Sequence, residues 1–228
     1  LQTELNAPVH LAAKTALSLQ GVAHFLSQQE SQSVYLFGGL GYKLPSWLLK
    51  PDKQQTVWGV NINYFTPKLF EKRELGLQPH SLVKIDGQVV VSSLERAILE
   101  VLYLIHKAQS LVEAKYLMEG LMTLRPDLLQ QLLEQCWSIT VKRLFCFLAD
   151  FCQLPCFSHL DLTAINLGSG KRVIAGGGYF VSKYQLSVPK QFVTTLKEEL
   201  TDYEVKYIEN KIKITLELLE AIKKSLKK

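Results

Sequence analysis

The sequence is poor in the residues that mark several specialised classes of protein. Only four of its 228 residues are cysteine, eight are proline and 13 are glycine. A chain of this length needs no disulfide to fold, so we expect reduced, buried thiols in a cytoplasmic protein. No uninterrupted apolar run approaches the roughly 18–20 residues of a membrane span, which argues against a membrane protein. The chain begins with Leu1 rather than methionine, and we expect it to be part of a longer protein.

Positive and negative charges nearly balance along most of the chain, and one stretch has an excess of positive charge. The chain has 26 Lys and Arg against 21 Asp and Glu, and 47% of its residues are hydrophobic, a composition that excludes a disordered charged tail. Residues 140–190 hold six basic and two acidic residues, whereas residues 1–139 hold twelve of each. A local positive surface is typical of contact with a phosphate-bearing or acidic partner, although scattered solvated side chains give the same count. The expected contact residues are Lys142, Arg143, Lys171, Arg172 and Lys183.

The order of the expected elements indicates an α+β fold with a small mixed sheet and a block of about four helices. Residues 82–91 predict a hairpin, because Asp86-Gly87 suits a type I′ turn. Ser92 and Glu95 have the spacing of a capping box that begins a helix directly after this hairpin. The other expected helices span about 5–26, 110–124, 126–137 and 141–152, and the other expected strands lie within 34–37, 57–65, 172–175 and 184–188.

The end of the chain differs in composition from the rest. Its last 38 residues contain no Gly, Pro or Cys. We therefore expect residues 1–190 to form one domain and residues 191–228 to form a helical tail. Apolar residues in the tail are spaced three and four apart, which is typical of a helix that joins copies of a chain and equally of a helix packed on its own domain. These residues are Val205, Ile208, Ile212, Leu219, Ile222 and Leu226.

The sequence contains no complete motif for chemistry. Gly168 to Arg172 lacks the first glycine and the final Ser or Thr of a phosphate-binding loop. There is no Gly-x-Ser-x-Gly nucleophile elbow and no His-Glu-x-x-His pair. Cys152, Cys156 and His159, with Cys146 as a fourth ligand, do not match the spacing of any common zinc module. We predict no catalytic residue, no cofactor and no metal.

An enzyme remains the alternative hypothesis. Carboxylates that are distant in the sequence could converge in the fold, as they do in nucleases and nucleotidyltransferases. Two or more of them within metal-bridging distance would favour this hypothesis. The candidates are Asp86, Glu95, Glu100, Asp150 and Asp161.

Seven stretches, in order, resemble the AbiEi family, the antitoxin component of AbiE-type (type IV) toxin–antitoxin systems. One of them, Ser-Leu-Glu-Arg-Ala-Ile-Leu-Glu, has Leu94 where the family motif has proline, but it keeps the cap serine and Arg96, a residue of the structural motif. The resemblance covers about residues 1–190 and leaves the tail without a family role. The stretches are residues 5–17, 36–41, 93–100, 117–126, 141–145, 161–172 and 183–189.

The resemblance implies a bacterial cytoplasmic protein that is not an enzyme. Family members have an N-terminal winged helix-turn-helix that binds and represses the promoter of their own operon. Their larger C-terminal domain counters a nucleotidyltransferase-like toxin, AbiEii, without forming a stable complex with it. By this resemblance the chain is the C-terminal domain, and the DNA-reading helices lie before Leu1. Its basic residues would then support promoter binding through phosphate contacts that are independent of sequence and sensitive to salt.

Overall fold

The computed structural model describes residues 2, 6–22, 33–45, 48, 56–57, 60–82, 87–105 and 107–192. The chain divides into two compact units, residues 1–169 and residues 170–228. This division comes before residue 190, where composition placed the domain boundary. The residues expected to form an oligomerisation seam lie outside the described residues; they are Val205, Ile208, Ile212, Leu219, Ile222 and Leu226.

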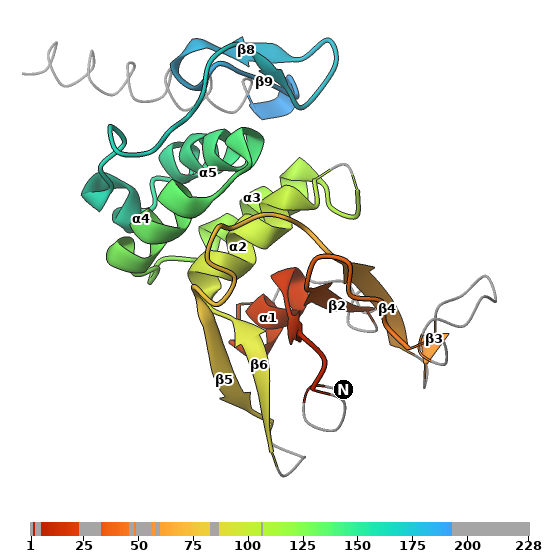
Figure 1. Ribbon diagram of the computed structural model, residues 1–228. Helices are drawn as coiled ribbons and strands as arrows, with labels where there is room; N and C mark the ends of the chain where they lie inside the picture. The colour runs from red at the N-terminus through yellow and green to blue at the C-terminus, as the bar shows by residue number, and fades with distance from the viewer. Residues whose placement is uncertain are drawn as a thin grey trace, which may run out of the picture. The chain divides into compact units, whose positions relative to one another are not determined.

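The first unit contains a mixed sheet with six described strands in the order β3-β4-β2-β1-β6-β5 (Figure 1). β2 pairs in parallel with β4 and antiparallel with β1, whereas β1 meets β6 at the single pair Leu11 and Val91. The predicted α+β class and mixed sheet are therefore confirmed. The strands are β1 (Val9–Leu11), β2 (Ser33–Gly38), β3 (Thr56–Val57), β4 (Val60–Phe65), β5 (Leu77–Ser81) and β6 (Gln88–Ser92).

The expected hairpin is present, but its register differs from the prediction. Ser81 lies opposite Gln88, whereas a two-residue turn at Asp86-Gly87 would place Gln88 opposite residue 85, so the register is not the predicted one; Asp86 itself lies outside the described residues. Pro79 lies in β5 at the edge of the sheet, a position where a missing backbone N–H is tolerated. The register of a strand depends on which face packs on the core, and local turn propensity does not contain that information.

The start of the chain also differs from the prediction of one helix over residues 5–26. Val9–Leu11 form strand β1, and only Ala13–Leu19 form helix α1. β1 pairs with residues 36–38 of β2, which are distant in the sequence. Such non-local pairing overrides the local helical spacing of apolar residues.

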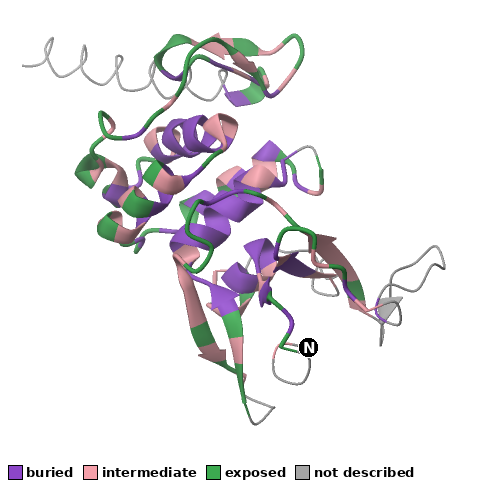
Figure 2. Ribbon diagram, in the orientation of Figure 1, coloured by how far each residue is buried: buried purple, intermediate pink, exposed green. Residues whose placement is uncertain are grey.

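Four helices follow the hairpin as predicted, and α2 lies at their centre (Figure 2). The side chains of residues 95–102 of α2 are all buried, and α2 contacts α1, α3, α4 and α5. The Ser110 hydroxyl caps α3 by accepting from Glu113 N at 3.1 Å, and Pro126 begins α4. No helix in the described part of the chain is long and apolar enough to cross a membrane. The helices are α2 (Leu94–Tyr103), α3 (Leu111–Glu119), α4 (Pro126–Gln135) and α5 (Ile139–Phe151), followed by the 3-10 helix η2 (Pro155–His159).

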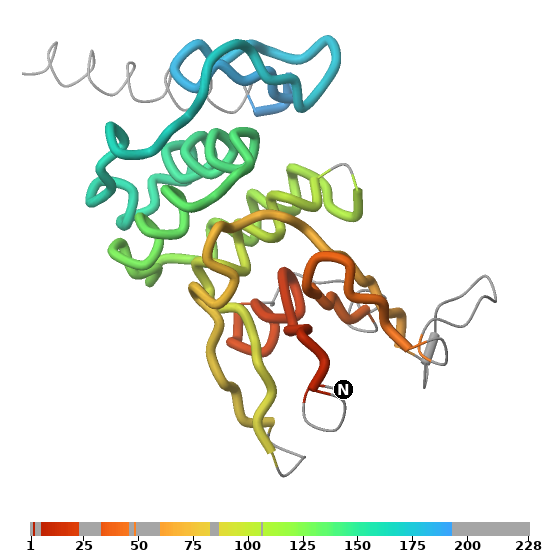
Figure 3. Tube along the Cα trace, in the orientation of Figure 1, coloured from red at the N-terminus to blue at the C-terminus, as the bar shows by residue number. Residues whose placement is uncertain are grey.

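The second unit contains a small sheet of three described strands in the order β7-β9-β8. These strands are β7 (Arg172–Val173), β8 (Tyr179–Val181) and β9 (Leu186–Val188), and the 3-10 helix η3 (Ser182–Tyr184) joins β8 to β9, as the tube in Figure 3 traces. Its described core consists of Ile174, Tyr184, Leu186, Val188 and Phe192. The two strands predicted at residues 172–175 and 184–188 are confirmed as β7 and β9, whereas β8 was not predicted.

Candidate functional site

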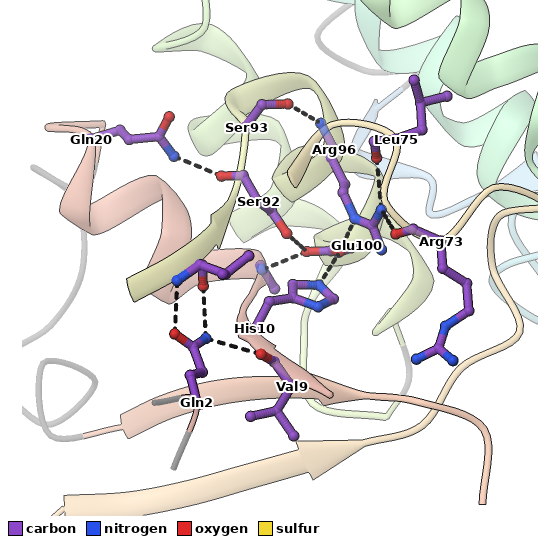
Figure 4. A network of polar contacts seen from close by, with 12 residues as sticks. Gln2, Val9, His10, Gln20, Arg73, Leu75, Ser92, Ser93, Arg96 and Glu100 are labelled. Carbon is purple, nitrogen blue, oxygen red and sulfur yellow. Dashed lines mark hydrogen bonds and ion pairs between the residues drawn. The ribbon is translucent and has the colours of Figure 1, made fainter. Parts of the chain in front are cut away.

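A fully buried carboxylate, Glu100, is the centre of a polar network in the first unit (Figure 4). Its Oε1 accepts hydrogen bonds from His10 Nε2 at 3.0 Å and from Arg96 Nε at 2.8 Å. Its Oε2 accepts from Ser92 Oγ at 2.7 Å and from the backbone N of Ala13 at 3.0 Å. The donors belong to β1, α1, α2 and β6, so one side chain connects the sheet with two helices.

The electrostatics of this network keep Glu100 ionised. Burial acts to raise the pKa of its carboxyl, but the charges and hydrogen bonds of His10 and Arg96 outweigh burial and lower that pKa to about 2. Four donors occupy the roughly four acceptor positions of the two oxygens. Glu100 therefore acts as a structural anion, because it has neither a proton to give at neutral pH nor an acceptor position left for a metal.

Arg96 connects the network to the segment that precedes β5. Its Nη1 donates to the carbonyl oxygens of Arg73 at 2.6 Å and Leu75 at 2.7 Å. Its guanidinium carbon lies 4.8 Å from the centroid of the Phe70 ring, a cation–π contact. Arg96 thus holds the backbone of residues 73–75 against α2 while it neutralises Glu100.

The predicted capping box at the start of α2 is wrong by one residue. Ser93, not Ser92, is the N-cap, and its hydroxyl accepts from Arg96 N at 3.4 Å. Ser92 is still part of β6 and donates to Glu100 instead. Glu95 points to Arg125, whose Nε and Nη2 reach its two oxygens at 3.0 and 2.9 Å and whose backbone N donates to it at 2.8 Å. Ser92 and Ser93 could each cap the helix. Ser93 does so because the register of the hairpin keeps Ser92 in β6.

A cavity of about 460 Å³ lies beside this network. His10, Arg96 and Glu100 contribute to its lining, together with Phe37 and Phe70. The cavity is bounded by β1, β2, β5, β6, α2 and the segment before β5. The sequence analysis missed this site, since His10 and Glu100 are 90 residues apart and no short motif contains both. The only signal that joined them was that both belong to stretches resembling one family.

The carboxylates of the enzyme hypothesis have separate surroundings. Glu95 pairs with Arg125, Glu100 belongs to the network, and Asp161 is exposed in a turn where it accepts from Thr163 N at 2.9 Å and from the Thr163 hydroxyl at 2.6 Å. Asp150 is in α5, and Asp86 lies outside the described residues. Within the described ranges, no group of three or more His, Cys, Asp or Glu side chains could hold a metal ion.

Cys146 and Cys156 are buried, as expected, and Cys136 is buried too, whereas Cys152, also expected to be buried, is half-buried. Burial raises the pKa of the Cys136 thiol to about 11 and raises that of Cys156 as well. Protonated thiols are weak nucleophiles and weak metal ligands. These two side chains therefore serve as small apolar residues of the core.

Two of the five basic contact residues expected from the sequence are buried. Lys142 and Arg143 in α5 are 3% and 2% exposed. Arg143 donates from Nε and Nη2 to the carbonyl oxygens of Leu167 at 2.8 Å and Gly168 at 2.9 Å. Burial lowers the pKa of Lys142. A phosphate contact requires an exposed side chain, so neither of these two residues is placed to make one.

The other three expected contact residues lie in the second unit. Lys171 and Lys183 are exposed and Arg172 is half-buried. Arg172 is paired with the buried Leu186 across β7 and β9, so its side chain shares the core face of this small sheet. Lys171 lies on the other face, where its Nζ is 4.8 Å from the Phe180 ring. The small sheet thus brings the three residues into one unit but not onto one face.

Comparisons with known proteins identify a family and a solved structure of similar fold. The model of a family described as transcriptional regulator, AbiEi antitoxin, type IV TA system matches residues 31–189. The chain is also similar in fold to the crystal structure of the Rv2827c protein from Mycobacterium tuberculosis, with 14% sequence identity and a TM-score of 0.53. The match covers 82% of this chain and 64% of that one, so this chain spans less than two thirds of its length. A search of curated proteins finds no match.

Proposed function

Because the chain belongs to the AbiEi family of transcriptional regulators and antitoxins of type IV toxin–antitoxin systems, we propose that it is the antitoxin part of such a system. It counters a nucleotidyltransferase-like toxin in the bacterial cytoplasm, without forming a stable complex and without enzymatic chemistry of its own. It does so as the C-terminal part of an autoregulator whose winged helix-turn-helix reads the promoter.

The observation that carries this proposal is the extent of the family match. The match runs from before β2 to the end of β9. It therefore includes Glu100 with its partners Ser92 and Arg96, the helices α2–α5 and the small sheet. The surroundings of the carboxylates support the part of this proposal that says the chain is not an enzyme. Glu95 and Glu100 are each held by an arginine at 2.9 Å or less, and such pairs stabilise a fold.

Growth of bacteria that express the toxin tests this proposal. The toxin gene that the proposal predicts next to that of this chain is induced, and this chain is expressed from a promoter that it does not regulate, so that repression of the toxin gene cannot explain rescue. We expect growth to resume. Continued toxicity while the chain accumulates in folded form would contradict the proposal that it acts as an antitoxin.

We also propose that the full-length protein contacts promoter DNA through Lys171 and Lys183, and not through Arg172, which shares the core face of the small sheet. Both lysines are exposed in a unit of short strands and turns, and Lys171 is accompanied by the exposed Val173 and by Phe180. Lysine contacts with phosphates give affinity without sequence preference and position the protein on the duplex. The promoter sequence is then read by the winged helix-turn-helix.

The apolar seam between Val205 and Leu226 supports a separate proposal, that the tail joins copies of the chain. Light scattering of the chain with and without residues 191–228 tests it. We expect the intact chain to be a homo-oligomer and the shortened chain to be a monomer. A monomer in both cases would contradict the proposed role of the seam.

A further inference from the structure

The cavity beside the Glu100 network has no role in the function proposed above, yet it has the size of a ligand site. Its volume of about 460 Å³ falls within the roughly 300–1,000 Å³ of small-molecule pockets, which are largely preformed and mostly apolar. Apolar side chains from several elements supply much of its wall. Among them are Phe37 of β2, Leu77 of β5, Val90 of β6 and Phe70 from the segment before β5.

The sheet keeps this space open without leaving backbone groups unpaired. β1 and β6 pair at the single position of Leu11 and Val91, and the Gln2 side chain bridges the two strands beyond it (Figure 4). Gln2 Nε2 donates to the carbonyl oxygens of Val9 at 2.9 Å and Val90 at 3.0 Å, and its Oε1 accepts from Val90 N at 2.7 Å. The amide thus replaces direct pairing between two residues that both line the cavity. The opening is part of the fold, so no ligand is needed to form it.

The polar side chains of the wall are bonded to the protein itself. His10 and Arg96 are bonded to Glu100, and Gln78 Nε2 donates to Gln20 at 3.0 Å. In the part of the chain that the structure describes, this wall contains no buried side-chain nitrogen or oxygen that lacks a partner. A strongly polar ligand would lose its bonds to water and find no unsatisfied buried group to replace them.

The charges of the arginines and glutamates in the lining cancel. Arg96 and Glu100 form an ion pair at 2.8 Å, and Arg73 and Glu74 add one exposed charge of each sign. A charged ligand of either sign would therefore be desolvated without an excess of opposite charge to compensate it.

We propose that this cavity binds a small, neutral, apolar molecule, which contacts the rings of Phe37 and Phe70. Its binding free energy comes from the removal of apolar surface from water, because the polar groups of the wall are already engaged. This site goes beyond the antitoxin function and does not depend on it, so the failure of either proposal leaves the other in place.

NMR titration of the chain with toluene, benzoate and benzylamine tests this proposal, because the three probes share a ring and are similar in size. At neutral pH toluene is uncharged, benzoate is an anion and benzylamine is a cation. We expect saturable binding of toluene with a dissociation constant on the order of 1 mM, and at least about tenfold weaker binding of both charged probes. No saturable binding of toluene, or binding of a charged probe as tight as that of toluene, would overturn the proposal.

Methyl signals and a pair of variants locate the probe. We expect toluene to shift the methyl signals of Leu77 and Val90 and not those of Val173, an exposed valine of the second unit. V90W fills part of the cavity and should weaken toluene binding at least about tenfold. The matched control is Q88W, at an exposed position on the same strand that does not line the cavity, and it should leave binding unchanged; circular dichroism checks that both variants are folded. Unchanged binding to V90W, or shifts at Val173 without shifts at Leu77 and Val90, would contradict the proposal.

Discussion

His10 Nε2 lies 3.0 Å from Glu100 Oε1, although the two residues are 90 positions apart in the chain. The same oxygen also accepts from Arg96, while the other oxygen is held by Ser92 and by the start of α1. One carboxylate thus fixes the position of β1 and β6 relative to α2. The arrangement of the first unit, including the cavity beside it, depends on this contact.

Replacing Glu100 is therefore expected to destabilise the first unit strongly. Glu100→Ala leaves the buried guanidinium of Arg96 without its anion, and breaking a buried ion pair in this way costs about 3–5 kcal/mol. Urea unfolding measures the loss. The control is Glu119→Ala, since Glu119 pairs with Lys115 at 2.6 Å with its side chain 43% exposed, and such surface pairs contribute about 1 kcal/mol or less. Similar losses in both variants would contradict the structural role of Glu100.

The same carboxylate makes stability depend on pH. Its pKa is about 2 in the folded chain against an ordinary value of 4.5, so the unfolded chain takes up a proton first as the pH falls. The stabilisation is complete above about pH 4.5 and is lost as the pH falls toward 2, by an amount on the order of 3 kcal/mol. Unfolding free energies at a series of pH values, for the natural chain and for Glu100→Gln, check this. We expect the difference in unfolding free energy between the natural chain and Glu100→Gln to narrow below pH 4.5. A difference that stays constant with pH would contradict the role of the Glu100 charge.

The pair of Glu95 and Arg125 is expected to be asymmetric. The Glu95 side chain is 2% exposed and accepts from the backbone N of Arg125 as well as from its guanidinium, whereas the Arg125 side chain is 60% exposed. Arg125→Ala keeps the backbone hydrogen bond and should cost about 1 kcal/mol, while Glu95→Ala also removes the acceptor at the start of α4 and should cost about 2–3 kcal/mol. Thermal unfolding of both variants measures this order, and the reverse order would refute it.

The helices α2–α5 were predictable because their ends are marked locally. Ser110 with Glu113 and Pro126 at the start of α4 are signals within a few residues of the boundaries that they set. The sequence predicted these helices, the hairpin and the strands β7 and β9, and the order of these elements predicted the fold class.

The features that the sequence missed all depend on contacts between distant residues. β1 is a strand because it pairs with β2, and Ser92 is not the cap because the register of the hairpin keeps it in β6. Net charge identified a basic stretch, but α5 buries Lys142 and Arg143 within it. Counting charges along a chain does not show which side chains reach solvent.

The salt dependence of DNA binding by the full-length protein tests the central claim most directly. Binding to promoter DNA is measured over a range of salt concentrations for the natural protein, for Lys171→Gln with Lys183→Gln, and for Lys107→Gln, an exposed lysine of the first unit. We expect the double variant to bind more weakly and its slope of log K against log salt to decrease by about 0.9 for each lost phosphate contact, while Lys107→Gln keeps the natural slope. An unchanged slope in the double variant would contradict the proposal that these two lysines meet DNA.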